Sequence, residues 1–257
     1  MEFNKRNILI IGNLVTLFLA LIMNFLSNAL PLNGKTAGEL SDSYPNLFVP
    51  AGYVFAIWGI IYVFLIIFGI YQALPQNKDK QFQENISFYF ILSNIANATW
   101  LFFWHFEYIL LSVLTMLVLL LSLIMIYLRL GIGVNQVERN EKLAVHTLFS
   151  IYLGWITVAT VANVTALLVS LSWDGLGINE EIWTWIVLVI ATAIVLTVIV
   201  TRRDIVYGLV PVWAFIGILV KQLDNSPSVA IGAGLFAGII FIVLVITSIQ
   251  SYRKVSA

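Results

Sequence analysis

Hydrophobic residues run along this chain in long stretches separated by short polar segments. Apolar stretches of spanning length cover residues 8–30, 48–73, 86–104, 108–130, 143–170, 182–201, 204–222 and 228–249. A helix that crosses the hydrocarbon core of a bilayer needs about 20 mostly apolar residues. The segments between the stretches carry Pro, Gly, Asn or charged residues, which favour turns. The pattern predicts an all-α fold, a polytopic membrane helix bundle with about eight transmembrane helices.

Composition supports the same class and limits the partners. Of 257 residues, 61% are hydrophobic and 10% are charged, and the mean hydropathy is +0.98. A soluble domain of this size needs more charged surface, so the lipid bilayer is the first partner that we expect. The formal net charge is zero, which gives no general attraction for nucleic acid, and no nucleic-acid partner is expected.

The positions of the basic residues predict the orientation of the helices. Eleven of the 13 Lys and Arg residues fall in the N-terminal segment, in the C-terminal segment and in every second connection between the stretches. Lys35 and Lys221 lie in the remaining connections. Because cytoplasmic loops are enriched in Lys and Arg, both termini are predicted to be cytoplasmic, and the protein is predicted to be a multi-pass protein of the cytoplasmic membrane.

Reactive side chains are sparse. The chain has no Cys, which excludes disulfides, thiol catalysis and thiolate metal sites. His105 and His146 are the only histidines, and no carboxylate lies at helical spacing from either, so no metal site is predicted. No acid–base pair or activated nucleophile is recognisable, and no catalytic residue is assigned. The residues favour a binding function over an enzymatic one, and no resident cofactor is predicted.

Four of the predicted helices each combine aromatic and polar residues on one face. Residues three or four apart share a face of a helix. The four faces are formed by Asn13, Thr16, Ala20, Asn24, Ser27 and Asn28; by Phe55, Trp58 and Tyr62; by Phe90, Ser93, Asn97, Trp100 and Trp104; and by Tyr152, Trp155, Ala159 and Asn163. Unpaired amides are costly in hydrocarbon, so these faces are expected to meet protein or a cavity.

Two interpretations of these faces are open. A single Asn or Thr is most simply a hydrogen-bonding contact between helices, and Trp173 and Trp183 fit the aromatic belt at a membrane surface. Aromatic and amide residues on several helices at once favour a ligand cavity instead.

The segment "GLFAG", from Gly234 to Gly238, allows close helix approach. It favours either packing of the last helices or a homodimer.

Three of the motifs resemble those of the TspO/MBR family, the tryptophan-rich sensory or translocator proteins. The second-helix signature of this family is similar to "VPAGYVFAIWGIIY", which supplies Pro50, Phe55, Trp58 and Tyr62, with Phe55 displaced by one position. The fifth-helix signature Tyr-x-x-Trp-x-x-x-Ala-Thr-x-x-Asn is met in full by residues 152–163. Asn97 and Trp100 match the Asn-x-x-Trp of the third helix.

The resemblance implies a five-helix bundle around a ligand pocket that opens toward the first loop, here residues 31–50. Ligands of the family are tetrapyrroles such as protoporphyrin and haem, and sterols in some members. The candidate ligand-binding residues are Asn28, Pro50, Phe55, Trp58, Tyr62, Asn97, Trp100, Trp104, Tyr152, Trp155, Ala159 and Asn163. We expect residues 1–172 to form this bundle and residues 173–257 to add three transmembrane helices.

The chain departs from the family pattern in its first loop, which is not rich in Trp, and at Ser150 and Ile151, where the family has a Pro before the fifth-helix Tyr.

The main functional prediction is a sensor or carrier that binds a flat hydrophobic ligand: a porphyrin, haem or a sterol-like molecule. A transporter of a small hydrophobic metabolite is the first alternative. A light-dependent porphyrin-degrading enzyme is the second.

Overall fold

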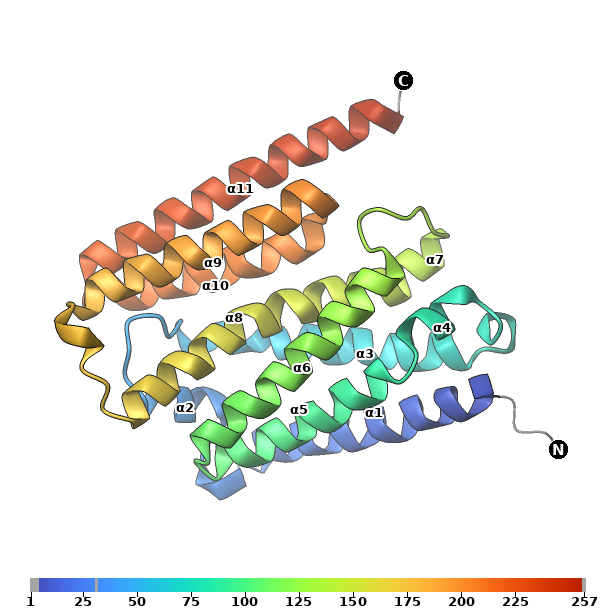
Figure 1. Cartoon of the computed structure of the whole chain (residues 1–257), viewed down its shortest axis with the longest axis horizontal. Helices are drawn as coiled ribbons and strands as arrows, with labels where there is room; N and C mark the ends of the chain where they lie inside the picture. Colours follow the sequence, from blue (N-terminus) through green and yellow to red (C-terminus); the bar gives the residue numbers. More distant parts are fainter. Residues whose placement is uncertain (1–4, 31, 256–257) are drawn as a thin grey trace.

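The described part of the chain folds into eight long helices joined by short connections that contain shorter helical turns (Figure 1). The computed structural model describes residues 5–30 and 32–255, without the side chains of residues 5, 28 and 252–255. The long helices are α1 (Lys5–Ala29), α3 (Ile57–Ala73), α5 (Tyr89–His105), α6 (Ile109–Leu130), α8 (Thr147–Ser170), α9 (Glu180–Arg202), α10 (Ile205–Gln222) and α11 (Pro227–Val255). The shorter ones are η1 (Leu32–Gly34), α2 (Ala37–Asp42), η2 (Gly52–Ala56), η3 (Pro75–Asn77), α4 (Gln81–Ile86), α7 (Arg139–Glu141), the π-helical turn η4 (Lys142–His146) and η5 (Gly175–Gly177).

Each predicted apolar stretch corresponds to one of the long helices. Seven of these helices are long and apolar enough to cross a membrane, if η2 and α3 are counted as one helix. The eighth, α5, has 17 residues, which gives a length of roughly 25 Å at 1.5 Å per residue. It packs between α1 and α6. The predicted all-α membrane bundle is therefore confirmed, and the described residues contain no strand.

The first five long helices and the last three form two adjoining layers (Figure 1). In the first layer, α5 packs on α1 and α6, α8 packs on α6, and α3 packs on α1 and α8. In the second layer, α11 packs on α9 and α10, and Gly234 of α11 faces the Leu219 side chain of α10. The "GLFAG" segment thus contributes to helix packing within the chain.

The two layers meet where α10 packs against α8 and against η2, just before α3. The backbone N–H of Ala51 donates to the Gly217 carbonyl oxygen at 3.1 Å, and Nε1 of Trp213 donates to the Val54 carbonyl oxygen at 3.1 Å. A Cβ atom on Gly217 would lie 2.1 Å from Cγ2 of Val54, so this approach requires glycine. The start of α3 is therefore held from both layers.

A buried carboxylate joins the layers at their other end. Asp204, directly before α10, accepts hydrogen bonds from the Tyr127 hydroxyl at 2.9 Å, the Ser150 hydroxyl at 2.6 Å and the Tyr207 backbone N–H at 3.1 Å. It is 6% exposed. The Tyr207 bond is a helix N-cap, while Tyr127 and Ser150 belong to α6 and α8. One side chain thus caps α10 and fixes it to the first layer.

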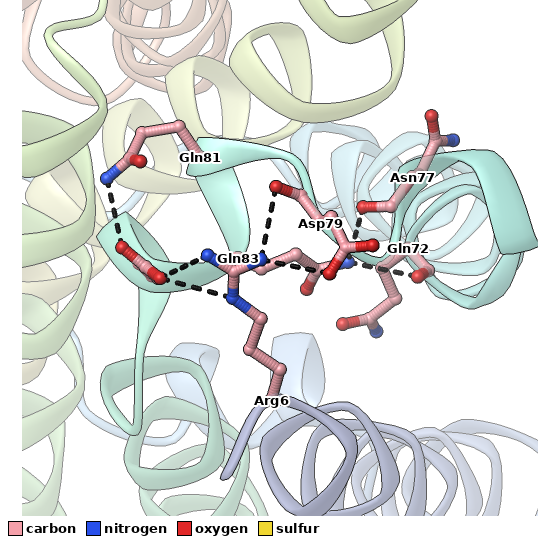
Figure 2. A network of polar contacts seen from close by, with 7 residues as sticks. Arg6, Gln72, Asn77, Asp79, Gln81 and Gln83 are labelled. Carbon is pink, nitrogen blue, oxygen red and sulfur yellow. Dashed lines mark hydrogen bonds and ion pairs between the residues drawn. The ribbon is translucent and has the colours of Figure 1, made fainter. Parts of the chain in front are cut away.

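α1 begins and α11 ends at the same end of the bundle, as an even number of crossings requires (Figure 1). At this end Arg6 forms ion pairs with Asp79 and Glu84, and Nε2 of Gln83 donates to the Gln72 carbonyl oxygen at 3.0 Å (Figure 2). These contacts fasten the start of α1 and the end of α3 to the connection that contains α4.

Candidate ligand-binding site

Trp58 is the centre of an aromatic cluster inside the first layer. Its ring stacks on Tyr62, one turn further along α3, at 5.7 Å between centroids, and on Trp100 of α5 at 6.1 Å. The rings of Tyr152 and Trp155 in α8 meet it edge-on at 6.1 and 6.3 Å. Three helices thus each contribute aromatic residues to one place, as the sequence pattern predicts.

Phe55 joins this cluster because η2 precedes α3. Phe55 lies in η2, three positions before Trp58. Its ring meets Trp155 edge-on at 5.8 Å. The displacement of Phe55 by one position in the sequence motif does not remove it from the cluster.

Amide side chains flank the aromatic rings on the α1 side. The Tyr62 hydroxyl donates to Oδ1 of Asn24 at 2.6 Å, and Nδ2 of Asn24 donates to Oδ1 of Asn97 at 2.6 Å. Asn24 and Asn97 are 4% and 2% exposed. Nδ2 of Asn97 has no hydrogen-bond partner among the described residues, which leaves a buried donor next to the cluster.

A second polar chain lies on the opposite side. Nε1 of Trp100 donates to Oδ1 of Asn163 at 3.1 Å, and Nδ2 of Asn163 donates to the Ser112 hydroxyl at 2.9 Å. All three residues are buried. Nε1 of Trp155 is also buried and has no partner within the described part of the chain. Asn163 is therefore already paired inside the protein, whereas Asn97 and Trp155 each retain an unpaired N–H group.

Residues 32–50, which we call the lid, cover this cluster. Their short helix α2 starts with a capping box, in which the Thr36 hydroxyl and the Glu39 carboxylate bond each other's backbone N–H groups. Nε1 of Trp104 donates to the Ala37 carbonyl oxygen at 3.3 Å. Asp42 at the end of α2 forms an ion pair with Lys221 of α10. The first loop is thus a folded cover rather than an extended linker.

Two lid residues have shifted pKa values. Hydrogen bonds from the Thr36 backbone and hydroxyl lower the pKa of Glu39. Burial, assisted by a 2.9 Å hydrogen bond to the Glu107 carboxylate, raises the pKa of Tyr44 to about 12. Tyr44 also packs on Trp104, with 6.0 Å between ring centroids. Glu39 therefore stays ionised to a lower pH, and Tyr44 stays protonated to a higher pH, than these side chains do in water; these are the forms that make the two hydrogen bonds.

The cluster encloses a cavity of about 40 Å³. Its lining comes from the lid, α3, α5 and α8: Ala37, Ser41, Pro50, Phe55, Trp58, Trp100, Trp104, Trp155, Val158, Ala159, Ala162 and Asn163. A second cavity of about 250 Å³, which shares Ala37, Phe55 and Trp58, lies between the lid and the α1 side. The described lining of the smaller cavity contains no His or carboxylate.

Most of the candidate residues predicted from the sequence therefore lie together. Tyr62, Asn97 and Tyr152 border the cluster without lining the smaller cavity. The side chain of Asn28 lies outside the described residues. Sequence reasoning missed Ala37 and Ser41 of the lid and the pairing of Ser112 with Asn163. A capping-box pattern, Thr-x-x-Glu at residues 36–39, was the available signal for the lid helix.

Comparison with known proteins adds one finding. A family model described as TSPO-like protein matches residues 8–246, which include α9, α10 and most of α11. The match thus extends well beyond residues 152–163, the last of the motifs that resemble the TspO/MBR family. No curated protein and no solved structure matches the chain. The chain belongs to the family of TSPO-like proteins, in agreement with the TspO/MBR motifs of α3, α5 and α8.

Proposed function

We propose that this integral membrane protein binds a flat hydrophobic ligand at the Trp58 cluster and acts as a sensor or carrier for it. A tetrapyrrole or a sterol-like molecule is the candidate ligand. The observation that carries the proposal is the convergence of aromatic rings from three helices on Trp58, beneath a folded lid. Such rings give a flat ligand apolar contact area and favourable ring–ring geometry.

The two unpaired donors beside the rings support a ligand with acceptor groups at its edge. Nδ2 of Asn97 and Nε1 of Trp155 are both N–H donors without partners among the described residues. A buried donor that lacks a partner costs about 1–3 kcal/mol, so a ligand carboxylate, carbonyl or hydroxyl oxygen would gain by pairing with it. Because the lining of the smaller cavity offers no His, an iron porphyrin would be held there through its ring and its edges.

Binding requires the cluster to open. Ligand pockets usually measure about 300–1,000 Å³, and the enclosed cavity measures about 40 Å³. The neighbouring 250 Å³ cavity is bordered by Thr36, Gly38 and Glu39 of the lid. In the proposed mechanism α2 moves away, the two cavities merge, and the ligand separates the stacked rings of Trp58 and Trp100.

The proposal assigns different tasks to the two layers. Residues 1–172 would form the ligand-binding bundle and residues 173–257 would brace it, since α10 holds both η2 and the lid. The distribution of Lys and Arg supports a cytoplasmic-membrane location with both termini inside.

The direct test is a titration of the purified protein in lipid nanodiscs with protoporphyrin, haem and cholesterol. Four of the eight Trp residues belong to the cluster, so tryptophan fluorescence should be quenched, saturably and with one ligand per chain, by a porphyrin that enters it. Cholesterol is not a quencher and is scored by its competition with the porphyrin. Quenching that rises linearly without saturation would indicate partitioning into lipid and contradict the proposal.

A further inference from the structure

A cavity larger than the two at the Trp58 cluster lies away from that cluster, between α8 and α9. It measures about 660 Å³. These two helices follow each other in the chain, but each packs against α10, and the space between them stays open. The cavity runs along α9 from Glu180 to Ile194, roughly 21 Å at 1.5 Å per residue. Its volume is typical of a pocket for one drug-sized molecule.

The part of this cavity along the middle of α8 and α9 is apolar and open at the surface, where Val164, Ile190 and Ile194 are exposed. Val161 and Val164 of α8 face Val187, Ile190 and Ile194 of α9. The three Thr residues in the lining satisfy their hydroxyls within their own helices: Thr160 donates to the Ile156 carbonyl oxygen at 2.7 Å, Thr165 to the Ala162 carbonyl oxygen at 2.8 Å and Thr184 to the Glu180 carbonyl oxygen at 2.9 Å. These hydroxyls are therefore already hydrogen-bonded within the protein, and the walls suit a hydrocarbon chain.

The mouth has a different chemistry. It lies at the connection between α8 and α9, where Asp174 and Glu180 line it together with the paired rings of Trp173 and Trp183, 5.1 Å apart. The described lining contains no Lys, Arg or His. Carboxylates attract a cation, and Trp rings attract organic cations through their π-faces. A membrane-surface belt role for the two Trp residues requires neither the cavity nor the carboxylates.

An adjoining polar cavity shares Pro45, Asn46 and Glu180 with this mouth and contains Lys221. The Lys221 ammonium is occupied by its ion pair with Asp42. The charge at the mouth therefore remains negative. An anionic amphiphile, including a tetrapyrrole with free carboxylates, would meet repulsion here, while a cationic one would be attracted.

We propose that the cavity between α8 and α9 is a second binding site, for a free lipophilic organic cation with a hydrocarbon body and an ammonium head. The body lies between Val164 and Ile190, and the head lies at Asp174, Glu180 and the two Trp rings. A phospholipid with two acyl chains exceeds the size class of this cavity. The site does not depend on ligand binding at the Trp58 cluster.

The test is saturation binding of radiolabelled dodecyltrimethylammonium to the full chain in nanodiscs, with empty discs subtracted, and dodecyl sulfate as the probe of opposite charge. The double variant Asp174→Asn and Glu180→Gln keeps the hydrogen bonds to the backbone N–H groups of Leu176 and Leu47. We expect it to weaken binding of the cation about tenfold, or about 1.4 kcal/mol. Ala191→Trp, which fills the cavity, should abolish saturable binding.

Asp224→Asn is the matched control, because Asp224 is an exposed carboxylate outside the lining of this cavity, and thermal unfolding verifies that every variant is folded. The proposal would be overturned if dodecyl sulfate bound as tightly as dodecyltrimethylammonium. It would also be overturned if Asp224→Asn weakened binding as much as the double variant, or if a folded Ala191→Trp variant bound the cation as the wild type does. The assay is repeated in discs of phosphatidylcholine and of a neutral galactolipid. Saturable binding only in the galactolipid discs would identify a choline lipid as the occupant and also overturn it.

Discussion

At the scale of single residues, the hydrogen bonds of buried amides decide whether the pocket is rigid. Asn163 accepts from Nε1 of Trp100 at 3.1 Å and donates to the Ser112 hydroxyl at 2.9 Å. It thereby fixes the Trp100 ring that stacks on Trp58. Asn163 lines the cavity itself and also positions Trp100, another residue of the lining.

We predict that Asn163→Leu lowers the free energy of unfolding by about 1–3 kcal/mol, because the buried N–H group of Trp100 loses its acceptor. The same change should weaken ligand binding, since the Trp100 ring becomes mobile. Equilibrium unfolding in mixed micelles measures the first effect. In a Trp100→Phe background, where that donor is already missing, Asn163→Leu should cost less. An equal cost in both backgrounds would contradict the assigned pairing.

The residues of the cluster could be predicted because helical spacing decides which side chains share a face. This spacing alone predicts that Trp58 and Tyr62 share one face of their helix. It predicts the same for Trp155 and Asn163. The partner of each amide could not be predicted, because that depends on the rotation of neighbouring helices. Ser112 is an ordinary polar residue in the sequence, and only the packing of α6 on α8 brings it to Asn163.

At the scale of elements, the lid is fastened to both layers, and the proposed function makes it the part that must open. The Ala37 carbonyl oxygen at the start of α2 accepts a hydrogen bond from Nε1 of Trp104, and Asp42 at the end of α2 forms an ion pair with Lys221. Leu40, Phe48 and Val49 of the lid are buried. Opening must therefore break specific contacts, and loops that close over sites often limit the rate of binding.

We predict that tying the lid to α10 slows ligand entry. The chain has no native Cys, so Asp42→Cys and Lys221→Cys can be joined by a short, cleavable thiol cross-linker. The association rate of protoporphyrin should fall on the order of tenfold, because fewer molecules are open, and cleavage of the linker should restore it. The Asp42→Cys single variant treated with the same reagent is the control. An unchanged rate in the cross-linked protein would mean that the ligand enters elsewhere.

We also predict that the contacts of Asp204, which fix α10 to the first layer, contribute to stability. Asp204→Ala removes the acceptor of the Tyr127 and Ser150 hydroxyls together with the N-cap of α10. It should lower the free energy of unfolding by about 1–3 kcal/mol or more. Asp204→Asn retains acceptor oxygen and should lose less, as thermal unfolding would show. Equal losses in the two variants would contradict the assigned hydrogen bonds.

The long helices could be predicted from the apolar runs. The ends of the runs lie within about six residues of the observed helix ends, except that the run 48–73 also includes the end of the lid and η2 before α3. The burial of Asp204 could not be predicted, because a carboxylate between two apolar runs usually lies in a solvated connection. Here it is buried because α6 and α8 each supply a hydroxyl to it. The lid helix α2 was also not predicted, since a six-residue helix in a polar segment has no apolar period.

At the scale of the whole molecule, the two ends of the bundle differ in charge. Single Cys residues introduced at Lys35 or Asp224 should react with an impermeant maleimide in intact cells, whereas those at Lys78 or Arg203 should not. All four positions are exposed on the protein, so labelling reports the side of the membrane. Reversed labelling at all four positions would place both termini outside. Labelling at Arg203 alone would mean that α9 and α10 do not both span.

The arrangement of the two layers was beyond sequence reasoning. Hydropathy counts spanning helices but does not say which of them touch. The cavity between α8 and α9 exists because both helices pack on α10, a helix later in the chain. Trp173 and Trp183 are predicted as belt residues from their position near a helix end, and their place at the mouth of this cavity depends on the tertiary fold.

The central claim is that the Trp58 cluster holds the ligand, and one comparison of variants tests it most directly. Protoporphyrin affinity is measured for the wild type, Trp155→Leu and Trp185→Leu. Trp155 lies in the cluster, whereas Trp185 packs on Phe236 of α11 outside both cavities. Loss of the Trp155 ring should cost about 1–3 kcal/mol of binding, about 5- to 150-fold in affinity, and Trp185→Leu should leave the affinity unchanged. Equal affinities for all three proteins would contradict the claim.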